Sequence, residues 1–242
     1  MPNIKLLVEY DGSDFLGWQT QPEGRTVQGE VSAALARILR EVVNLIGAGR
    51  TDTGVHARGQ VANFRTTSNM EPGAIMHALN GVLRPDVRVL AAGEVPEAFH
   101  SRFDALERMY RYHLSTVPSA LSRFREWYVS YKLNFELLQQ GAAMVRGFHD
   151  FTSFSKGGTE VSHYTCDVRK SIWSRDGGRF VYEIRADRFV RGMVRALVGN
   201  MVDLARGHVS TAEFAEILES RDRSKAGMAA PPHGLYLEEV VY

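Results

Sequence analysis

An aspartate flanked by glycines and hydroxyl side chains is the part of this sequence best suited to chemistry. Asp52 lies between Thr51 and Thr53, Arg50 precedes it by two positions, and glycines stand at 49 and 54. A nearby cation favours the ionised form of a carboxylate, and an ionised carboxylate in a fixed position can act as a nucleophile or a general base. The alternative is an Asp52 that caps a turn and pairs with Arg50, because Asp and Gly are ordinary turn residues.

The glycines before this aspartate have the spacing of the first two glycines of a dinucleotide-binding fingerprint. Gly47 and Gly49 follow a stretch with the pattern of a strand, as that fingerprint requires. The third glycine of the fingerprint would fall at Asp52, however, and no apolar helix pattern follows. The sequence therefore disfavours phosphate binding by a helix N-terminus at this place.

The composition limits the other kinds of site. The chain has 242 residues, of which 44% are hydrophobic, and this is enough to bury a core. Cys166 is the single cysteine, which excludes a disulfide within the chain and a cysteine-rich zinc site. His163 and Cys166 have metal-ligand spacing but lack a second pair, so packing or solvent contact is favoured for both. With no run of about 18 apolar residues and no signal-peptide pattern, we expect a cytoplasmic protein without a membrane span.

The charges nearly cancel, with 29 Lys and Arg against 28 Asp and Glu, and give no global indication of a nucleic-acid partner. Their distribution is uneven. Residues 165–195 hold eight basic and four acidic side chains, residues 102–125 hold five and two, and four acidic side chains gather between 213 and 222. A basic surface offset by an acidic one attracts phosphate despite a small net charge. Two solvated faces are the alternative.

The N-terminal half predicts four strands and two helices. The strands cover about 4–10, 41–48, 59–65 and 87–95. One helix follows a cap at Thr26 and carries apolar residues from Val27 to Leu39, and the other covers about 72–83 with a proline in its first turn. Residues 96–106 show no clear periodicity. We therefore expect a domain boundary there and an N-terminal domain of residues 1–105.

The C-terminal half, residues 106–242, predicts a second domain. Its strands are expected over about 107–116, 163–174, 179–187 and 235–242, with a hairpin turn at 176–178. Its helices are expected over about 135–146 after a cap at Asn134, over 192–206 before Gly207, and over 211–219. Most strands alternate apolar and polar residues, which is typical of half-covered antiparallel sheets. We therefore expect an α+β fold of two domains with mainly antiparallel sheets flanked by helices.

Five segments resemble the motifs of one family and occur in the same order along the chain. Together they extend over nearly the whole chain. Residues 49–57 (GRTDTGVHA) resemble the active-site motif of tRNA pseudouridine synthase A, with Thr53 where alanine is more frequent. The other four segments are 10–19 with 25–30 (YDGSDFLGWQ, RTVQGE), 108–112 (RMYRY), 189–195 (FVRGMVR, with Val190 where leucine is commoner) and 229–237 (AAPPHGLYL).

This resemblance implies an enzyme that isomerises uridine to pseudouridine at positions 38, 39 and 40 in the anticodon stem-loop of tRNA. In that reaction the C1′–N glycosidic bond breaks, the uracil turns, and a C1′–C5 bond forms. The resemblance implies no cofactor and no catalytic metal. It also implies a homodimer, in which one tRNA can touch both subunits, and sheets that meet beside a central basic active-site cleft.

The resemblance assigns roles to five residues. Asp52 matches the essential carboxylate, which either adds covalently to the sugar or removes a ribose proton to give a glycal. Tyr110 matches a tyrosine whose ring can stack on the target uracil. Arg195 matches an arginine that pairs with the aspartate, Arg50 one that holds or replaces the flipped nucleotide, and Leu235 an apolar residue near the base. From pattern alone, Tyr110 is an ordinary strand aromatic, Arg195 lies on a polar helix face and Leu235 is a core residue.

Two other functions are compatible with parts of the sequence. An RNA-binding module without catalysis would account for the basic stretches, and it predicts that Asp52→Ala leaves function intact. A nucleotide-binding oxidoreductase would account for Gly47 and Gly49, and it predicts nicotinamide or flavin absorbance in the purified protein.

Overall fold

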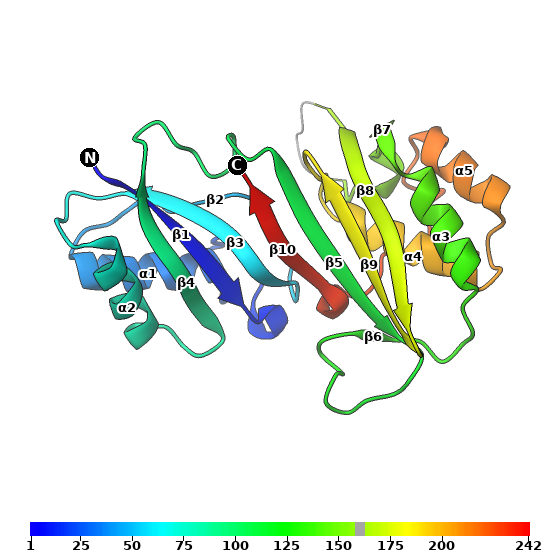
Figure 1. Ribbon diagram of the computed structural model, residues 1–242, viewed down its shortest axis with the longest axis horizontal. Helices are drawn as coiled ribbons and strands as arrows, with labels where there is room; N and C mark the ends of the chain where they lie inside the picture. The colour runs from blue at the N-terminus through cyan, green and yellow to red at the C-terminus, as the bar shows by residue number, and fades with distance from the viewer. Residues whose placement is uncertain (158–162) are drawn as a thin grey trace. The chain divides into compact units, whose positions relative to one another are not determined.

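The computed structural model describes residues 1–157 and 163–242. By its contacts the chain divides into two compact units, and each contains a sheet and helices (Figure 1). Unit 1 comprises Met1–Leu106 and Tyr236–Tyr242, and unit 2 comprises Glu107–Leu235. The mixed α and β content expected from the sequence is confirmed. The division into two domains at residues 105 and 106 stays a prediction, and residues 236–242, which it assigned to the second domain, group with unit 1.

The sheet of unit 1 has the strand order β4-β1-β3-β10, and β2 pairs with β3. β1 is antiparallel to both β3 and β4, whereas β10 runs parallel to β3. The bounds are β1 Asn3–Tyr10, β2 Ile46–Gly47, β3 His56–Arg65, β4 Val87–Val95 and β10 Leu235–Val241.

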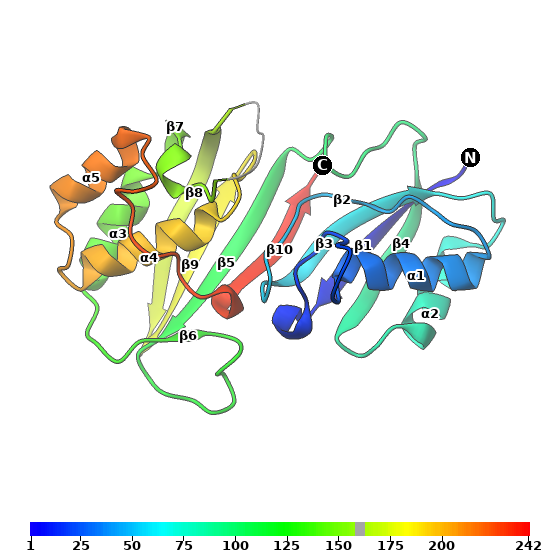
Figure 2. The ribbon, with the colours of Figure 1, turned by 180° about the vertical axis from the view of Figure 1, so that it is seen from behind.

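Two helices, α1 (Val27–Leu39) and α2 (Pro72–Val82), cover one face of this sheet (Figures 1 and 2). Leu6 of β1, Leu35 of α1 and Ile75 of α2 are fully buried in the resulting core. Alternate residues of β1 are buried because every second side chain of a strand points to the same face. Thr26 caps α1 as predicted, with its hydroxyl accepting from the Gly29 N–H at 3.3 Å.

The strand predicted over residues 41–48 is wrong for most of its length, because only β2 joins the ladder. Val42 is 95% exposed, and the Glu41 carboxylate accepts hydrogen bonds from Thr66 and Thr67. The apolar residues at 43 and 45 are buried without strand pairing. Hydrophobicity in this stretch therefore reflects burial and not an extended ladder.

β3 begins at His56, three residues before its predicted start. The extension pairs with β10, since Tyr236 lies opposite His56 and Leu237 lies opposite Ala57. The local residue pattern does not indicate pairing with a strand from the other half of the sequence. The strand was therefore predicted to begin too late.

The sheet of unit 2 has the strand order β5-β9-β8-β7, and every pair along it is antiparallel. β6 adds a short parallel pair to β5. The bounds are β5 Glu107–Ser115, β6 Trp127–Tyr128, β7 Gly147–Asp150, β8 Thr165–Asp176 and β9 Arg179–Ala186. The expected hairpin between β8 and β9 and the mainly antiparallel pairing in both units are confirmed. The short strands β6 and β7 were not predicted.

Three helices lie on one side of the unit 2 sheet (Figure 2). They are α3 (Phe135–Met144), α4 (Met193–Ala205) and α5 (Thr211–Ser220), and α5 packs against the other two. All three were predicted, although α3 ends two residues early. The described 3₁₀ turns are η1 Gly12–Asp14 in unit 1 and η2 Thr152–Phe154 and η3 Pro232–Gly234 in unit 2. Among the described residues, no helix has the length and apolar character of a membrane span.

Candidate active site

Asp52 lies in the loop that joins β2 to β3, residues 48–55, which we call the Asp52 loop. Within it, the Val55 N–H donates to the Asp52 carbonyl oxygen at 3.1 Å and closes a turn. The Asp52 residue is half-buried, whereas Arg50 is exposed. β3 follows this loop directly and no helix begins there. The glycines at 47 and 49 therefore have no helix N-terminus to offer a dinucleotide phosphate, and the oxidoreductase alternative loses its structural basis.

The Asp52 loop is hydrogen-bonded to residues 10–18, which we call the backing segment. The Tyr10 hydroxyl and the Thr51 hydroxyl are 2.7 Å apart. The Trp18 N–H donates to the Thr51 carbonyl at 3.1 Å, and the Gly54 N–H donates to the Phe15 carbonyl at 3.3 Å. The loop is therefore held on both sides of Asp52.

Two glycines of the backing segment allow a close approach of the two backbones. A Cβ at Gly12 would collide with the Val55 carbonyl group, and a Cβ at Gly17 would lie 2.5 Å from the Thr51 carbonyl oxygen. Gly17 also has a φ of +97°, a conformation that other residues rarely adopt. The sequence reasoning did not identify these glycines, Tyr10 or Thr51 as supports, although all lie in motifs that carry the resemblance.

The other predicted site residues belong to unit 2. Tyr110, on β5, is 8% exposed, and its ring packs edge-to-face against Phe189 with centroids 5.0 Å apart. Leu235, at the start of β10, is 6% exposed. Asp52 and Arg50 share one loop of unit 1, whereas the pairing of Asp52 with Arg195 stays a prediction.

In unit 2, hydrogen bonds of Arg195 and Tyr112 connect three of the sequence motifs, residues 108–112, 189–195 and 229–237. The Arg195 Nε donates to the Ala230 carbonyl at 2.8 Å, and the Ala230 N–H donates back to the Arg195 carbonyl at 2.9 Å. The Tyr112 hydroxyl donates to the Pro231 carbonyl at 2.8 Å. Burial raises the pKa of Tyr112 well above its ordinary value, which keeps it a neutral donor, and nearby Arg195 opposes this only in part. Tyr112 was missed because one aromatic residue in a strand has no special pattern.

The face of the unit 2 sheet opposite its helices carries ion pairs. Glu183 lies 2.9 Å from Arg111 and 2.7 Å from Lys170. Glu107 lies 3.3 Å from Arg185 and 3.5 Å from Arg169. Cross-strand partners share a face of a sheet, and Arg111 pairs with Glu183 as Lys170 does with Arg185. We call these six residues the charged sheet face. Acidic side chains therefore lie among the basic ones here and are not confined to a separate acidic surface.

The charged sheet face holds Glu183 ionised. Burial acts to raise the pKa of this carboxyl, but hydrogen bonds from Lys170 and Arg111 outweigh it and bring the pKa to about 2. The two acids thus order four basic side chains, and the face keeps a formal charge of +2 from four basic and two acidic groups.

His163 and Cys166 do not act as a ligand pair in this structure. Cys166 is buried, and burial raises the pKa of its thiol to about 12. The His163 ring lies 2.5 Å from the Thr165 hydroxyl and 2.9 Å from the Arg188 guanidinium. Within residues 1–157 and 163–242, no three acidic, His or Cys side chains gather as a metal site requires.

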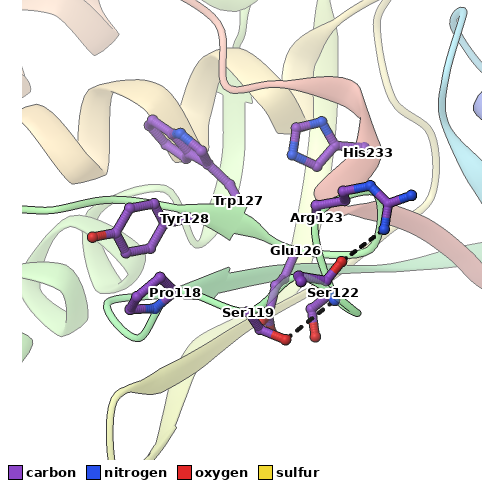
Figure 3. Close-up of a pocket in the computed structure, with 9 residues that line it drawn as sticks. Pro118, Ser119, Ser122, Arg123, Glu126, Trp127, Tyr128 and His233 are labelled. Carbon is purple, nitrogen blue, oxygen red and sulfur yellow. Dashed lines mark hydrogen bonds between the residues drawn. The ribbon is translucent and has the colours of Figure 1, made fainter.

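A cavity of about 520 Å³ lies in unit 2 beside the connection from β5 to β6 (Figure 3). Trp127, Tyr128 and His233 contribute aromatic rings to its lining, and Arg123 also lines it. The Arg123 guanidinium donates to the Ala120 carbonyl at 2.7 Å. Burial lowers the pKa of His233. None of the five predicted site residues lines this cavity.

The sequence model of a family described as tRNA pseudouridine synthase matches residues 6–104 and 142–242. A protein of Chlorobium luteolum named tRNA pseudouridine synthase A is 45% identical over 243 residues, covering 100% of this chain and 96% of the relative. Proteins of the same name from Acetivibrio thermocellus and Exiguobacterium are 41% and 39% identical, each over the whole of this chain and at least 98% of their own length. The chain therefore belongs to the tRNA pseudouridine synthase family and is an enzyme of the isomerase class.

Proposed function

We propose that this enzyme isomerises uridine to pseudouridine at positions 38, 39 and 40 in the anticodon stem-loop of tRNA. The observation that carries the proposal is the Asp52 loop, a carboxylate-bearing loop held by hydrogen bonds and backbone packing inside the family match. An irregular loop fixed in this way supplies a positioned carboxylate, which is what the reaction needs.

Asp52 is the essential carboxylate in this proposal. The C1′–N1 bond of the target uridine breaks and the base turns, after which a C1′–C5 bond forms and the C5 proton leaves. Asp52 either adds to the sugar and is later displaced, or it removes a ribose proton and a glycal results. Both routes require the ionised carboxylate next to the ribose, and neither requires a cofactor.

A uridine inside a stem must leave the base stack before it can react, and this costs a few kcal/mol. Tyr110 offers an aromatic ring for the extruded uracil and an oxygen for the C5 proton, and Leu235 packs near the base. Arg50, exposed beside Asp52, holds the flipped nucleotide or takes its place in the stack. Arg195 is the cation that pairs with the Asp52 carboxylate.

The proposed function also involves the two units, the cellular compartment and a second subunit. The two units act as domains whose sheets meet at a basic cleft around Asp52, and the enzyme works in the cytoplasm as a homodimer on one tRNA. The charged sheet face is suited to binding the phosphates of the tRNA, since its Arg and Lys side chains are held in place by ion pairs and such side chains bind phosphate.

Tritium release from tRNA that carries [5-³H]uridine tests the role of Asp52. We expect Asp52→Asn to lower the rate by more than about 10³-fold, because an amide is neither a nucleophile nor a base. Asp176→Asn, at an exposed aspartate at the end of β8, is the matched control and should keep the wild-type rate. Full activity of Asp52→Asn would contradict the assignment.

The target positions are tested separately with transcripts of one tRNA in which U38, U39 or U40 is replaced by cytidine. Mapping of pseudouridine should show loss of the modification only at the replaced position. Pseudouridine confined to another arm of the tRNA would refute the proposed site while leaving the reaction intact.

A further inference from the structure

His56 is the next-to-last residue of the motif that contains Asp52, yet no role follows from its type or position alone. It is the first residue of β3 and follows the Asp52 loop directly. Its side chain is 2% exposed, so it does not offer a surface for RNA. A buried, polar side chain this close to a proposed catalytic loop needs a partner, and its contacts show what it holds.

The Nδ1 atom of His56 reaches the corner where the backing segment leaves β1. It lies 3.0 Å from the Gly12 nitrogen and 3.1 Å from the Asp11 carboxylate. A ring nitrogen without a proton accepts from the Gly12 N–H, and one with a proton donates to Asp11. Either form of the ring therefore ties His56 to the same corner.

That corner is itself fixed. The Asp11 carboxylate accepts from the Ser13 N–H at 3.1 Å and from the Ser13 hydroxyl at 2.7 Å, and so caps η1. Next to it, the Gly12 backbone packs so closely on the Val55 carbonyl that a Cβ would not fit. A bond from His56 to this corner is therefore also a brace across the end of the Asp52 loop.

A face of the His56 ring is held by Tyr236 of β10. It stacks on the Tyr236 ring with centroids 4.7 Å apart and planes 25° apart. The Arg58 guanidinium lies 4.9 Å from the centroid of the same Tyr236 ring and 2.9 Å from the Glu238 carboxylate. These contacts leave the imidazole little freedom to turn, so Nδ1 stays directed at the corner.

We propose that His56 is a positioning residue, which fixes the Asp52 loop by bracing it between the Asp11–Gly12 corner and Tyr236. This inference rests on the proposed role of Asp52. It requires that loss of Nδ1 slows the chemical step while substrate binding is kept, because a displacement of about 1 Å from the productive geometry can cost about 10²-fold in rate.

Three substitutions distinguish the contacts of Nδ1 with the Asp11–Gly12 corner from the stacking of the ring on Tyr236. His56→Phe keeps an aromatic ring against Tyr236 but has no Nδ1. His56→Asn removes the ring and places an amide oxygen near the former Nδ1, where it can accept from Gly12. His56→Gln places its amide farther out, near the former Nε2. His77→Asn, at an exposed histidine of α2, is the matched control.

The measurements are the single-turnover rate of pseudouridine formation, the Kd for tRNA and the thermal unfolding midpoint. For His56→Phe we expect a rate lower by about 10²-fold with a Kd within a factor of two or three of wild type. His56→Asn should recover about tenfold of the loss, His56→Gln should recover little, and His77→Asn should match wild type. If His56→Phe does not fold, the Asn and Gln variants alone make the comparison.

A wild-type rate in His56→Phe would overturn the inference, and so would equal rates in the Asn and Gln variants. A rate loss matched by an equal loss of tRNA affinity would also overturn it, because that is the result for a residue that supports binding alone. Absence of pseudouridine with the wild-type enzyme would instead refute the proposed function, and the inference with it.

Discussion

The Asp52 loop and the charged sheet face of unit 2 are held by different kinds of interaction. The loop is fixed by hydrogen bonds to the backing segment and by backbone packing at Gly12 and Gly17. The charged sheet face is fixed by ion pairs between long side chains, of which Arg111 and Lys170 are 40% and 49% exposed.

The two regions therefore differ in how they tolerate substitution. Backbone packing has no slack, so a single added methyl group must displace the Asp52 loop. Partly exposed ion pairs are screened by water and salt, so removal of one charge is a graded loss. A proposed catalytic carboxylate is thus placed in the rigid region, and groups suited to a flexible RNA backbone are placed in the adaptable one.

Gly12→Ala tests the tight backbone packing behind the Asp52 loop. We expect the free energy of unfolding to fall by about 3 kcal/mol, because the new methyl group meets the Val55 backbone. Gly81→Ala in α2, where nothing lies within 4 Å of the position that the added methyl group would take, should instead stabilise by about 1 kcal/mol. Urea unfolding measures both, and a Gly12→Ala variant as stable as wild type would show that the loop has slack after all.

Glu183→Gln tests the ion pairs of the charged sheet face. The pKa of Glu183 is lowered from its ordinary 4.5 to about 2, so its stabilisation is present above pH 4.5 and is lost as the pH falls towards 2. After allowance for solvent screening, we expect a cost of about 2 kcal/mol at pH 7 and clearly less at pH 3. Glu216→Gln, from an exposed pair with Lys225, should cost little at either pH. An equal cost of Glu183→Gln at both values would argue against the ion-pair account.

Lys170→Gln should have only a small effect on tRNA affinity. If the charged sheet face meets the RNA backbone, the slope of log K against log salt should fall by about 0.7 to 0.9 for each phosphate that the variant no longer neutralises. Lys225→Gln removes an equally exposed lysine that is also ion-paired with a glutamate, and its slope should equal that of wild type. Filter binding at several salt concentrations gives both slopes, and identical slopes would remove this face from the RNA-binding surface.

The parts of the fold that were predictable depend on neighbours in sequence. The Thr26 cap, the β8–β9 hairpin and the helix ahead of Gly207 rest on residues a few positions apart. The early start of β3 was missed because its partners there, Tyr10 of β1 and two residues of β10, are distant in the sequence. The stretch at 41–45 was misassigned because its apolar side chains are buried without a ladder.

The same limit applies to the candidate site. Asp52 could be predicted as a site residue from its immediate neighbours and from the family resemblance. The supports at Tyr10 and Gly12 did not, because a contact across some 40 positions has no local pattern. Glycine suggests only a turn until the structure shows the carbonyl group that excludes a side chain.

The return of the chain to unit 1 at Tyr236 has a consequence for how this enzyme is made on the ribosome. Unit 1 is interrupted after Leu106, and its strand β10 emerges only after all of unit 2 has been synthesised. Until then β3 lacks its parallel neighbour, and His56 and Arg58 lack Tyr236 and Glu238. A nascent chain that ends before β10 thus has the Asp52 sequence but not the braced loop, and the site matures only when the two distant segments of unit 1 meet.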